Sequence, residues 1–131
     1  MHTGRLVFSQ LLDFLPMHDF DLCARRYPTR YRLRGFSCFD QFLAMAFAQL
    51  TGRESLRDIV NCLGAMQPKL YHAGFRSRVS RSTLADANER RDWRIFADFA
   101  QLLIVRARRL YAGEDFGVDL DRTAYVLDST T

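Results

Sequence analysis

Apolar residues recur at helical spacing for about five turns in the C-terminal third of the chain. This spacing predicts a helix over residues 93–112, with Asp92 as a candidate cap or kink in front of it. The apolar positions of this helix are Trp93, Phe96, Ala97, Ala100, Leu103, Ile104, Ala107, Leu110 and Tyr111. A long, one-sided stripe is typical of a helix that buries one face, and this helix is the most secure element in the sequence.

Two further helices are predicted from clear start signals. Ser37 is the expected N-cap of a helix over residues 38–51, which ends at Gly52. Ser55 and Asp58 resemble a capping box at the start of a helix over residues 54–63. The expected buried positions are Phe39, Phe42, Leu43, Ala46, Phe47 and Leu50 in the first helix, and Leu56, Ile59, Val60 and Leu63 in the second.

The remaining predicted helices are short. Residues 5–15 form one that stops at Pro16, and Asp19 is the expected N-cap of another that ends at Arg26. Pro68 opens a helix that ends near Gly74. Residues 83–91 form the last, capped by Ser82 or Ser80.

The pattern changes after Gly113. Residues 114–122 are acidic and loop-like, and residues 123–127 have the apolar pattern of a buried strand that runs into Asp128. The expected fold class is therefore mainly α up to residue 112. The strand belongs to a different structural unit.

Composition favours one packed domain. The chain has 131 residues, 48% of them hydrophobic, which gives a real core but not two full domains. Its apolar runs are too short to span a bilayer, and no secretory signal is visible at the N-terminus. We therefore expect a cytoplasmic protein without a membrane partner.

Charge divides the chain into two regions. Residues 1–112 carry 18 basic and 10 acidic side chains, a balance of +8, whereas residues 113–131 carry one basic and five acidic side chains, a balance of −4. All the basic residues but one are arginine, whose planar fork of donors matches phosphate groups and guanine edges. A GC-rich genome would also raise the arginine content. The division itself suggests two functional regions.

A first candidate DNA-binding cluster is interleaved with Tyr27 and Tyr31. It consists of Arg25, Arg26, Arg30, Arg32 and Arg34. Such a stretch can neutralise several phosphates while the tyrosines brace or stack. The alternative is a solvated, positively charged loop between two helices.

A second candidate lies in three consecutive predicted helices, over residues 54–63, 68–74 and 82–91, which resemble a helix-turn-helix unit. In such a unit the start of the last helix faces the bases of the major groove. The polar side chains of this region are Arg76, Arg78, Arg81, Ser82, Thr83, Asn88, Arg90 and Arg91. Arginine and asparagine can read guanine and adenine bidentately. An ordinary helical bundle with a polar surface is the alternative.

Asp128 is the candidate catalytic and metal-binding residue. A carboxylate at the end of a central strand can hold a divalent metal, and paired Mg²⁺ ions assist phosphoryl transfer. A lone aspartate at a strand end is also a common turn residue. One carboxylate does not build such a site alone.

Several blocks of the sequence occur together in one family. These blocks are residues 4–10 (GRLVFSQ), 34–42 (RGFSCFDQF), 49–58 (QLTGRESLRD), 82–96 (STLADANERRDWRIF) and 127–131 (LDSTT). With them the chain resembles the N-terminal region of the insertion-sequence-4 type DDE transposases, including the uncharacterised domain that precedes the catalytic core.

The resemblance implies a function in cut-and-paste DNA transposition. Residues 1–75 would be the family's N-terminal helical domain, residues 76–112 a basic helix and a long connecting helix, and residues 113–131 the start of an RNase-H-like core. The N-terminal part would bind the terminal inverted repeats of the element as double-stranded DNA, in association with the nucleoid. Asp128 would be the first Mg²⁺ ligand.

The resemblance also limits the expected chemistry. The other acidic residues of the family's triad would lie beyond residue 131, so we expect the chain alone to be inactive and to bind no Mg²⁺. A homo-oligomer is a further expected partner. The alternative function is a helical dimerisation module without DNA specificity of its own, with residues 8–20 as its aromatic surface.

Overall fold

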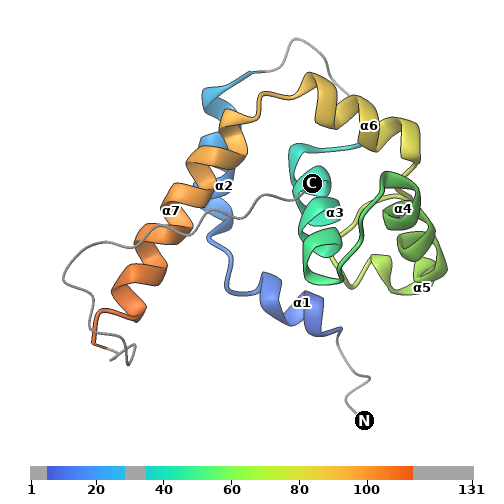
Figure 1. The fold of residues 1–131 in the computed structure, drawn as a ribbon. Helices are drawn as coiled ribbons and strands as arrows, with labels where there is room; N and C mark the ends of the chain where they lie inside the picture. Colours follow the sequence, from blue (N-terminus) through green and yellow to red (C-terminus); the bar gives the residue numbers. More distant parts are fainter. Residues whose placement is uncertain (1–5, 29–34, 114–131) are drawn as a thin grey trace.

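The fold is a set of helices arranged around α3 (Figure 1). The computed structural model describes residues 6–28 and 35–113. Its helices are α1 (Val7–Leu12), α2 (Met17–Arg26), α3 (Cys38–Leu50), α4 (Leu56–Ala65), α5 (Gln67–Leu70), α6 (Arg81–Arg90) and α7 (Arg94–Leu110). The prediction of a mainly helical protein is confirmed. The predicted strand over residues 123–127 and the Asp128 that follows it lie outside the described residues.

Helix α3 begins at the predicted cap. The Ser37 hydroxyl accepts a hydrogen bond from the Asp40 backbone N–H at 3.0 Å, and the Asp40 carboxylate accepts one from the Ser37 backbone N–H at 2.7 Å. These reciprocal bonds form a complete capping box. At the other end Gly52 has φ +64°, a left-handed conformation that stops a helix at low steric cost.

The main core lies between α3, α4 and α6. Leu43 and Phe47 of α3, Leu63 of α4 and Leu84 of α6 are buried in it. The segment between α5 and α6 contributes Phe75 and Val79. Burial of this apolar surface is the main driving force for packing the three helices together.

A second, smaller core attaches α2 and α7 to α3. Its buried residues are Phe20 and Cys23 of α2 with Ile95 and Phe99 of α7. The ring of Phe99 makes edge-on contacts with Phe20, at 5.1 Å between centroids, and with Phe42 of α3, at 5.4 Å. Edge-to-face contacts of this kind add to the energy of burial.

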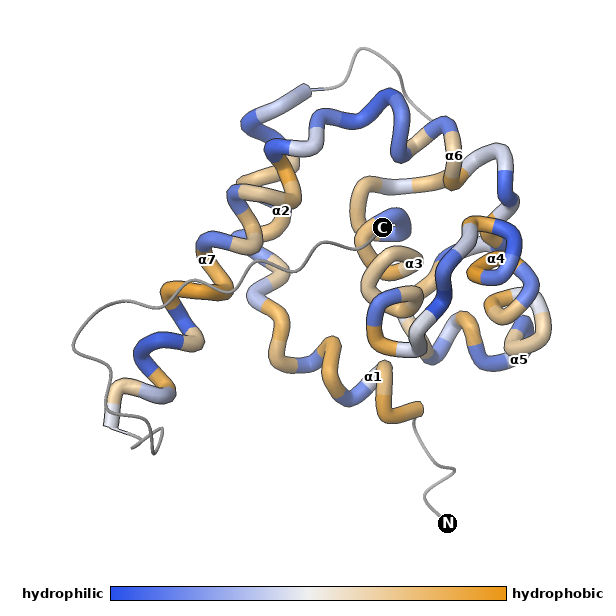
Figure 2. Tube along the Cα trace, in the orientation of Figure 1, coloured by the Kyte–Doolittle hydropathy of each residue, from blue (hydrophilic) through white to orange (hydrophobic). Residues whose placement is uncertain are grey.

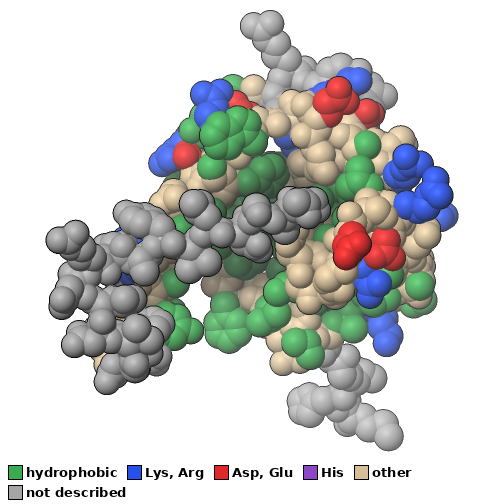
Figure 3. All heavy atoms as spheres, in the orientation of Figure 1, with side chains coloured by type: hydrophobic (Ala, Val, Ile, Leu, Met, Phe, Trp, Pro, Cys, Tyr) green, Lys and Arg blue, Asp and Glu red, His purple; other side chains and the backbone are tan. Residues whose placement is uncertain are grey.

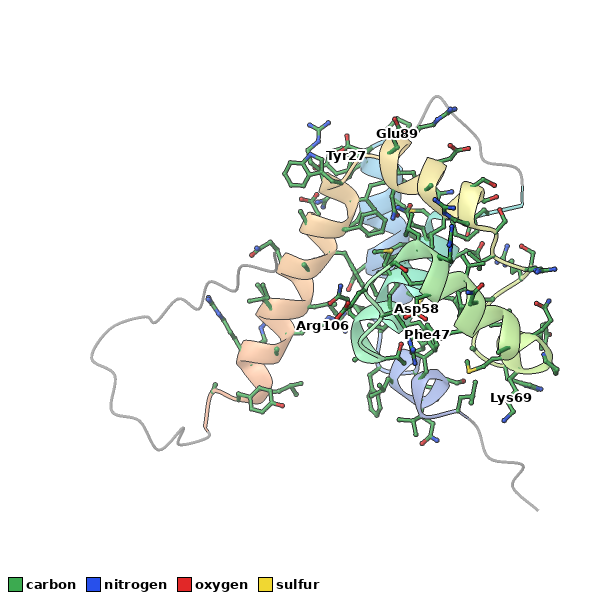
Figure 4. The ribbon with its side chains drawn as sticks, turned by 45° about the vertical axis from the view of Figure 1, so that its right-hand side comes forward. Tyr27, Phe47, Asp58, Lys69, Glu89 and Arg106 are labelled. Carbon is green, nitrogen blue, oxygen red and sulfur yellow. The ribbon has the colours of Figure 1, made fainter. Side chains whose placement is uncertain are left out.

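Helices α2 and α7 run antiparallel, as their ion pairs show. Arg26 at the end of α2 contacts Asp98 near the start of α7 at 3.1 Å, and Asp19 near the start of α2 contacts Arg106 further along α7 at 2.7 Å. Arg106 is labelled on α7 in Figure 4. The prediction that Asp19 caps α2 is wrong. The N-cap is Pro16, without a side-chain cap bond, and Asp19 in the first turn binds the partner helix instead.

The apolar stripe predicted for α7 is only partly the face that α7 buries, because Phe96 and Leu103 of the stripe pack against the smaller core without being fully buried. Only Ile95 and Phe99 of this helix are buried, on the side that packs against α2. On the predicted stripe, Trp93 is 72% exposed and Leu110 is 78% exposed. Figure 2 shows hydrophobic and hydrophilic residues alternating along α7, which therefore carries two apolar sides of which one is covered.

The buried face of α3 also differs from the prediction. Leu50 is exposed, whereas the polar residues Asp40 and Gln41 are buried. Asp40 is needed inside because it closes the capping box, and Gln41 bonds to α6. No helix within residues 6–28 and 35–113 is long and apolar enough to cross a membrane.

Candidate nucleic-acid interface

The N-terminal end of α6 is organised by Ser80. Its hydroxyl accepts a hydrogen bond from the Thr83 backbone N–H at 3.1 Å and donates one to the Thr83 hydroxyl at 2.8 Å. The Ser82 hydroxyl lies 3.2 Å from the Ser80 hydroxyl. Of the two predicted caps, Ser80 is therefore the observed one. The predicted base-facing hydroxyls of Ser82 and Thr83 belong to this cap cluster.

The segment in front of α6 presents its arginines to solvent. Phe75 and Val79 are buried in the main core, while Arg76 and Arg78 between them are exposed. The Ser77 hydroxyl donates a hydrogen bond to the Gly35 carbonyl oxygen at 3.0 Å, which ties the segment to the start of the α3 region. Anchors on both sides hold the two exposed arginines in place.

A depression of about 440 Å³ connects the starts of α4 and α6. Its lining residues are Ser55, Leu56, Arg57 and Arg81. Ser55 caps α4 by accepting a hydrogen bond from the Asp58 backbone N–H at 3.1 Å. The N-termini of α4 and α6 thus lie close to the guanidinium groups of Arg57 and Arg81. The partial positive charge of each helix N-terminus adds to the charge of these groups. Figure 3 shows Lys and Arg side chains gathered over this part of the surface, with acidic side chains beside them.

We define the basic edge as Arg57, Arg76, Arg78 and Arg81. All four side chains are exposed, and within the described part of the chain none forms a hydrogen bond or an ion pair. By contrast, Arg26, Arg94 and Arg106 form ion pairs of 3.1 Å or less. The basic edge therefore offers guanidinium groups that have no intramolecular role among residues 6–28 and 35–113. Such groups are free to meet external phosphates.

The first predicted arginine cluster is only partly described. Arg25 is exposed at the end of α2, and Arg26 beside it pairs with Asp98. Arg30, Arg32 and Arg34 lie outside the described residues. Tyr27 braces this end of α2, because its hydroxyl donates a hydrogen bond to Asp98 at 3.0 Å and its ring packs 4.8 Å from the Arg94 guanidinium.

Arg91 and Asn88 are engaged with α3. The Arg91 guanidinium donates to the Ser37 carbonyl at 2.7 Å, to Gln41 Oε1 at 3.0 Å and to the Phe36 carbonyl. Gln41 Nε2 in turn donates to Asn88 Oδ1 at 2.7 Å. Burial lowers the pKa of Arg91 from its usual value. This cluster fixes the end of α6 to the start of α3, so the structure separates Arg91 from the exposed arginines at the other end of α6.

Arg90, between these two residues, is exposed and has an interaction partner of its own. The predicted DNA-reading set thus divides along α6. Arg76, Arg78 and Arg81 lie exposed at or before its start, whereas Asn88 and Arg91 at its end make intramolecular bonds.

The pattern along the chain did not reveal Arg57. This residue lies on α4, far from Arg81 in sequence, and only the packing of α4 against α6 brings the two to one depression. The available signal was its position just inside a capped helix start, where a basic residue opposes the helix dipole and so is unexpected on stability grounds.

A separate, apolar groove of about 410 Å³ lies between α3 and the junction of α6 with α7. Its walls include Phe42, Met45 and Ala46 of α3, with Trp93 and Phe96 across from them. Gln41, Gln49, Asn88 and Arg91 complete the lining. The basic edge and this groove share no residue.

No described residues form a group of three or more His, Cys, Asp or Glu side chains that could hold a metal ion. Asp128, the predicted catalytic and Mg²⁺-binding residue, lies outside the described residues.

The part of the chain that the structure describes defines a helical protein with a basic edge made of unpaired arginines. A family model described as a domain of unknown function (DUF4372) matches residues 3–76, more than half of the chain. The chain therefore belongs to this family. The matched range includes α1 to α5, and α6 and α7 follow it. No curated protein matches the chain, and no solved structure does.

Proposed function

We propose that the chain binds double-stranded DNA through the basic edge and is the N-terminal part of a DDE transposase. The observation that carries the proposal is the set of four exposed arginines at the starts of α4 and α6, which have no partner within the described part of the chain. Surface arginines without an intramolecular partner contribute little to the stability of the fold. Their gathering at one edge favours an anionic partner.

The arrangement suits a DNA backbone better than a single small anion. Arg76 and Arg78 extend the cationic surface along the loop away from the depression at Arg57 and Arg81. Backbone phosphates of DNA are repeated along a strand, so a row of guanidinium groups can meet several of them at once. The Ser80 hydroxyl cluster supplies further donors for phosphate oxygens.

The transposase assignment rests on the sequence blocks that resemble insertion-sequence-4 type enzymes. In this proposal the DNA is the terminal inverted repeat of the element, and the protein works at the nucleoid. Asp128 is the first Mg²⁺-binding carboxylate of an RNase-H-like core, and the helix-turn-helix role belongs to α4, α5 and α6. When bound, Mg²⁺ would supply charge stabilisation for phosphoryl transfer.

Fluorescence anisotropy with a labelled inverted-repeat duplex tests DNA binding. We expect binding at low salt with a steep loss of affinity as salt rises, since each phosphate contact contributes a slope of about −0.9 in log K against log salt. The double variant Arg57→Ala/Arg81→Ala should lower that slope by about two.

The matched control is Arg108→Ala/Arg109→Ala, which removes the same charge from exposed positions at the far end of α7. This control should keep most of the affinity. Equal losses of DNA affinity in the two double variants would show that binding depends only on the net charge of the protein. Absence of binding at low salt would refute the proposal. Equal affinity for a random duplex would remove the specificity for inverted repeats.

A further inference from the structure

The most extensive unexplained surface of the molecule is the exposed apolar side of α7. Ile104 is 43% exposed, Tyr111 is 51% exposed, and Ala100 and Ala107 on the same side are also exposed. The α7 stripe, as we call this surface, comprises Trp93, Phe96, Ala97, Ala100, Leu103, Ile104, Ala107, Leu110 and Tyr111. Phe96 and Leu103 at its border are half-buried against the smaller core, and the other members except the half-buried Ala97 are exposed. It carries no charged residue and extends about 27 Å along the helix. A contiguous apolar surface of this length is typical of an interaction site.

The stripe has a hollow at one end and a projection at the other. At its start, Trp93 and Phe96 form one wall of the apolar groove, which Phe42, Met45 and Ala46 of α3 complete. At its end, Leu110 projects with 78% of its surface exposed. A hollow and a matching projection on one surface are complementary when a second copy is turned end to end against the first.

We propose that two copies of this chain pair through antiparallel α7 stripes, with Leu110 and Tyr111 of each copy inserted in the apolar groove of the other. In the register that sets Trp93 opposite Leu110 of the second copy, Phe96 faces Ala107 and Leu103 faces Ala100. These two layers, between the groove at either end, each combine a larger side chain with a smaller one. Alternation of large and small residues lets two helices approach closely and interdigitate.

Charge favours the antiparallel direction. Arg108 and Arg109 are adjacent near the end of α7, and a parallel pair would bring four guanidinium groups close together, whereas Arg106 is paired with Asp19. In the antiparallel pair this end lies near Asp92 of the other copy, at the start of its α7. Asp92 forms a 2.6 Å ion pair with Arg94, so the start of α7 carries a carboxylate among its charges, which the arginine-only end of α7 lacks.

The available area is sufficient for a weak but specific dimer. An aromatic side chain buries roughly 150–250 Å² when fully covered, so the exposed parts of Trp93 and Tyr111, with the aliphatic residues between them, amount to on the order of 500 Å² per copy. The pair would bury about 1,000 Å² in total, the size at which specific interfaces begin. The inference does not rest on DNA binding.

Sedimentation equilibrium of the whole 131-residue chain over a range of concentrations tests the pairing. We expect a monomer–dimer equilibrium. Ile104→Glu should raise the dissociation constant at least tenfold, because it places a charge in the middle of the stripe. The matched control is Val105→Glu: Val105 has nearly the same exposure, 47% against 43%, but lies on the opposite side of α7 from the stripe. It should leave the dissociation constant within about twofold.

Leu110→Glu tests the insertion into the groove. It lies in the last turn of α7, so it should weaken pairing as strongly as Ile104→Glu while leaving helix content by circular dichroism unchanged. A wild-type chain that stays monomeric at several hundred micromolar would overturn the proposal and assign the stripe to a different partner. Equal effects of Ile104→Glu and Val105→Glu would overturn it as well. Loss of DNA binding in the arginine variants would not bear on it.

Discussion

The guanidinium of Arg91, just after α6, connects this helix to α3 and to the segment before α3. It bonds to backbone carbonyls before α3 and to Gln41 inside α3, and it packs over the Phe36 ring at 5.5 Å. Gln41 in turn donates a hydrogen bond to Asn88 of α6. Among the described residues Arg91 is the one donor to the Phe36 carbonyl, whereas the Ser37 carbonyl also accepts from the Gln41 backbone N–H at 3.2 Å. A buried carbonyl left without a donor is costly.

We therefore predict that Arg91→Ala lowers the free energy of unfolding by about 2–3 kcal/mol, since it removes several hydrogen bonds to a charged donor. Urea unfolding followed by circular dichroism measures the change. Arg78→Ala is the control, because Arg78 is exposed and should cost less than about 0.5 kcal/mol. Similar stabilities of the two variants would contradict a structural role for Arg91.

Tyr27 gives a second prediction at this scale. The hydrogen bond that its hydroxyl donates to the Asp98 carboxylate raises the pKa of Tyr27 above its usual value near 10. A raised pKa in the folded state means that this bond contributes stability below about pH 10 and that the contribution is lost as pH rises through the folded pKa. The wild type should thus exceed Tyr27→Phe in stability at pH 7–9, and the difference should shrink above pH 10. Urea titrations at several pH values measure it, and a constant difference would exclude the bond as its source.

At the scale of elements, local signals located most of the helices. They also predicted the buried positions Ile59 and Leu63 of α4 and Leu43 and Phe47 of α3, but not the fully buried positions of α7. The caps at Ser37 and Ser55, the proline at Pro68 and the left-handed glycine at Gly52 act within one turn of chain, so the sequence alone reveals them. The buried face of α7 depends on α2, and α7 offers two apolar sides. Periodicity detects the longer side, whereas packing fully buries Ile95 and Phe99 and covers only the border of the longer side, at Phe96 and Leu103.

Two glycines of neighbouring elements should respond oppositely to alanine. Gly64 lies inside α4, where an added Cβ meets nothing within 4 Å, so Gly64→Ala should stabilise by about 0.5–1 kcal/mol. Gly74 has φ +87° and an added Cβ there would lie 3.3 Å from the Leu43 side chain. Gly74→Ala should destabilise by at least about 1–2 kcal/mol. Thermal unfolding of the two variants compares them, and the same sign for both would show that the turn conformation at Gly74 is not required.

At the scale of the molecule, the two cores have different roles. The main core holds α3, α4 and α6 and positions the basic edge, and the smaller core joins the α2–α7 pair to α3. The candidate interface was only partly predictable for the same reason. Arg76, Arg78 and Arg81 follow one another in sequence, but Arg57 joins them only through the packing of α4 on α6, and Arg91 leaves the set through its contacts with α3.

Removal of one ring should separate these two parts. Phe99→Ala takes away the contacts to both Phe20 and Phe42, and it should cost about 3–5 kcal/mol. Hydrogen exchange should then accelerate in α2 and α7 more than in α4 and α6, because the main core keeps its contacts. Uniform acceleration throughout the described helices would instead indicate a single cooperative unit.

The Arg91 cluster has a mechanical consequence. Only Arg91, Asp92 and Trp93 connect α6 to α7; Arg91 bonds to the segment before α3, and Asp92 bonds to Arg94 at the start of α7. The basic edge and the α7 stripe are thus joined by a short connection with bonds on both sides. Pairing through the stripe would then set two basic edges at a fixed separation. Such a pair would recognise spacing between two DNA segments by avidity, with gains of about 10²–10⁴ where the spacing fits and none where it does not.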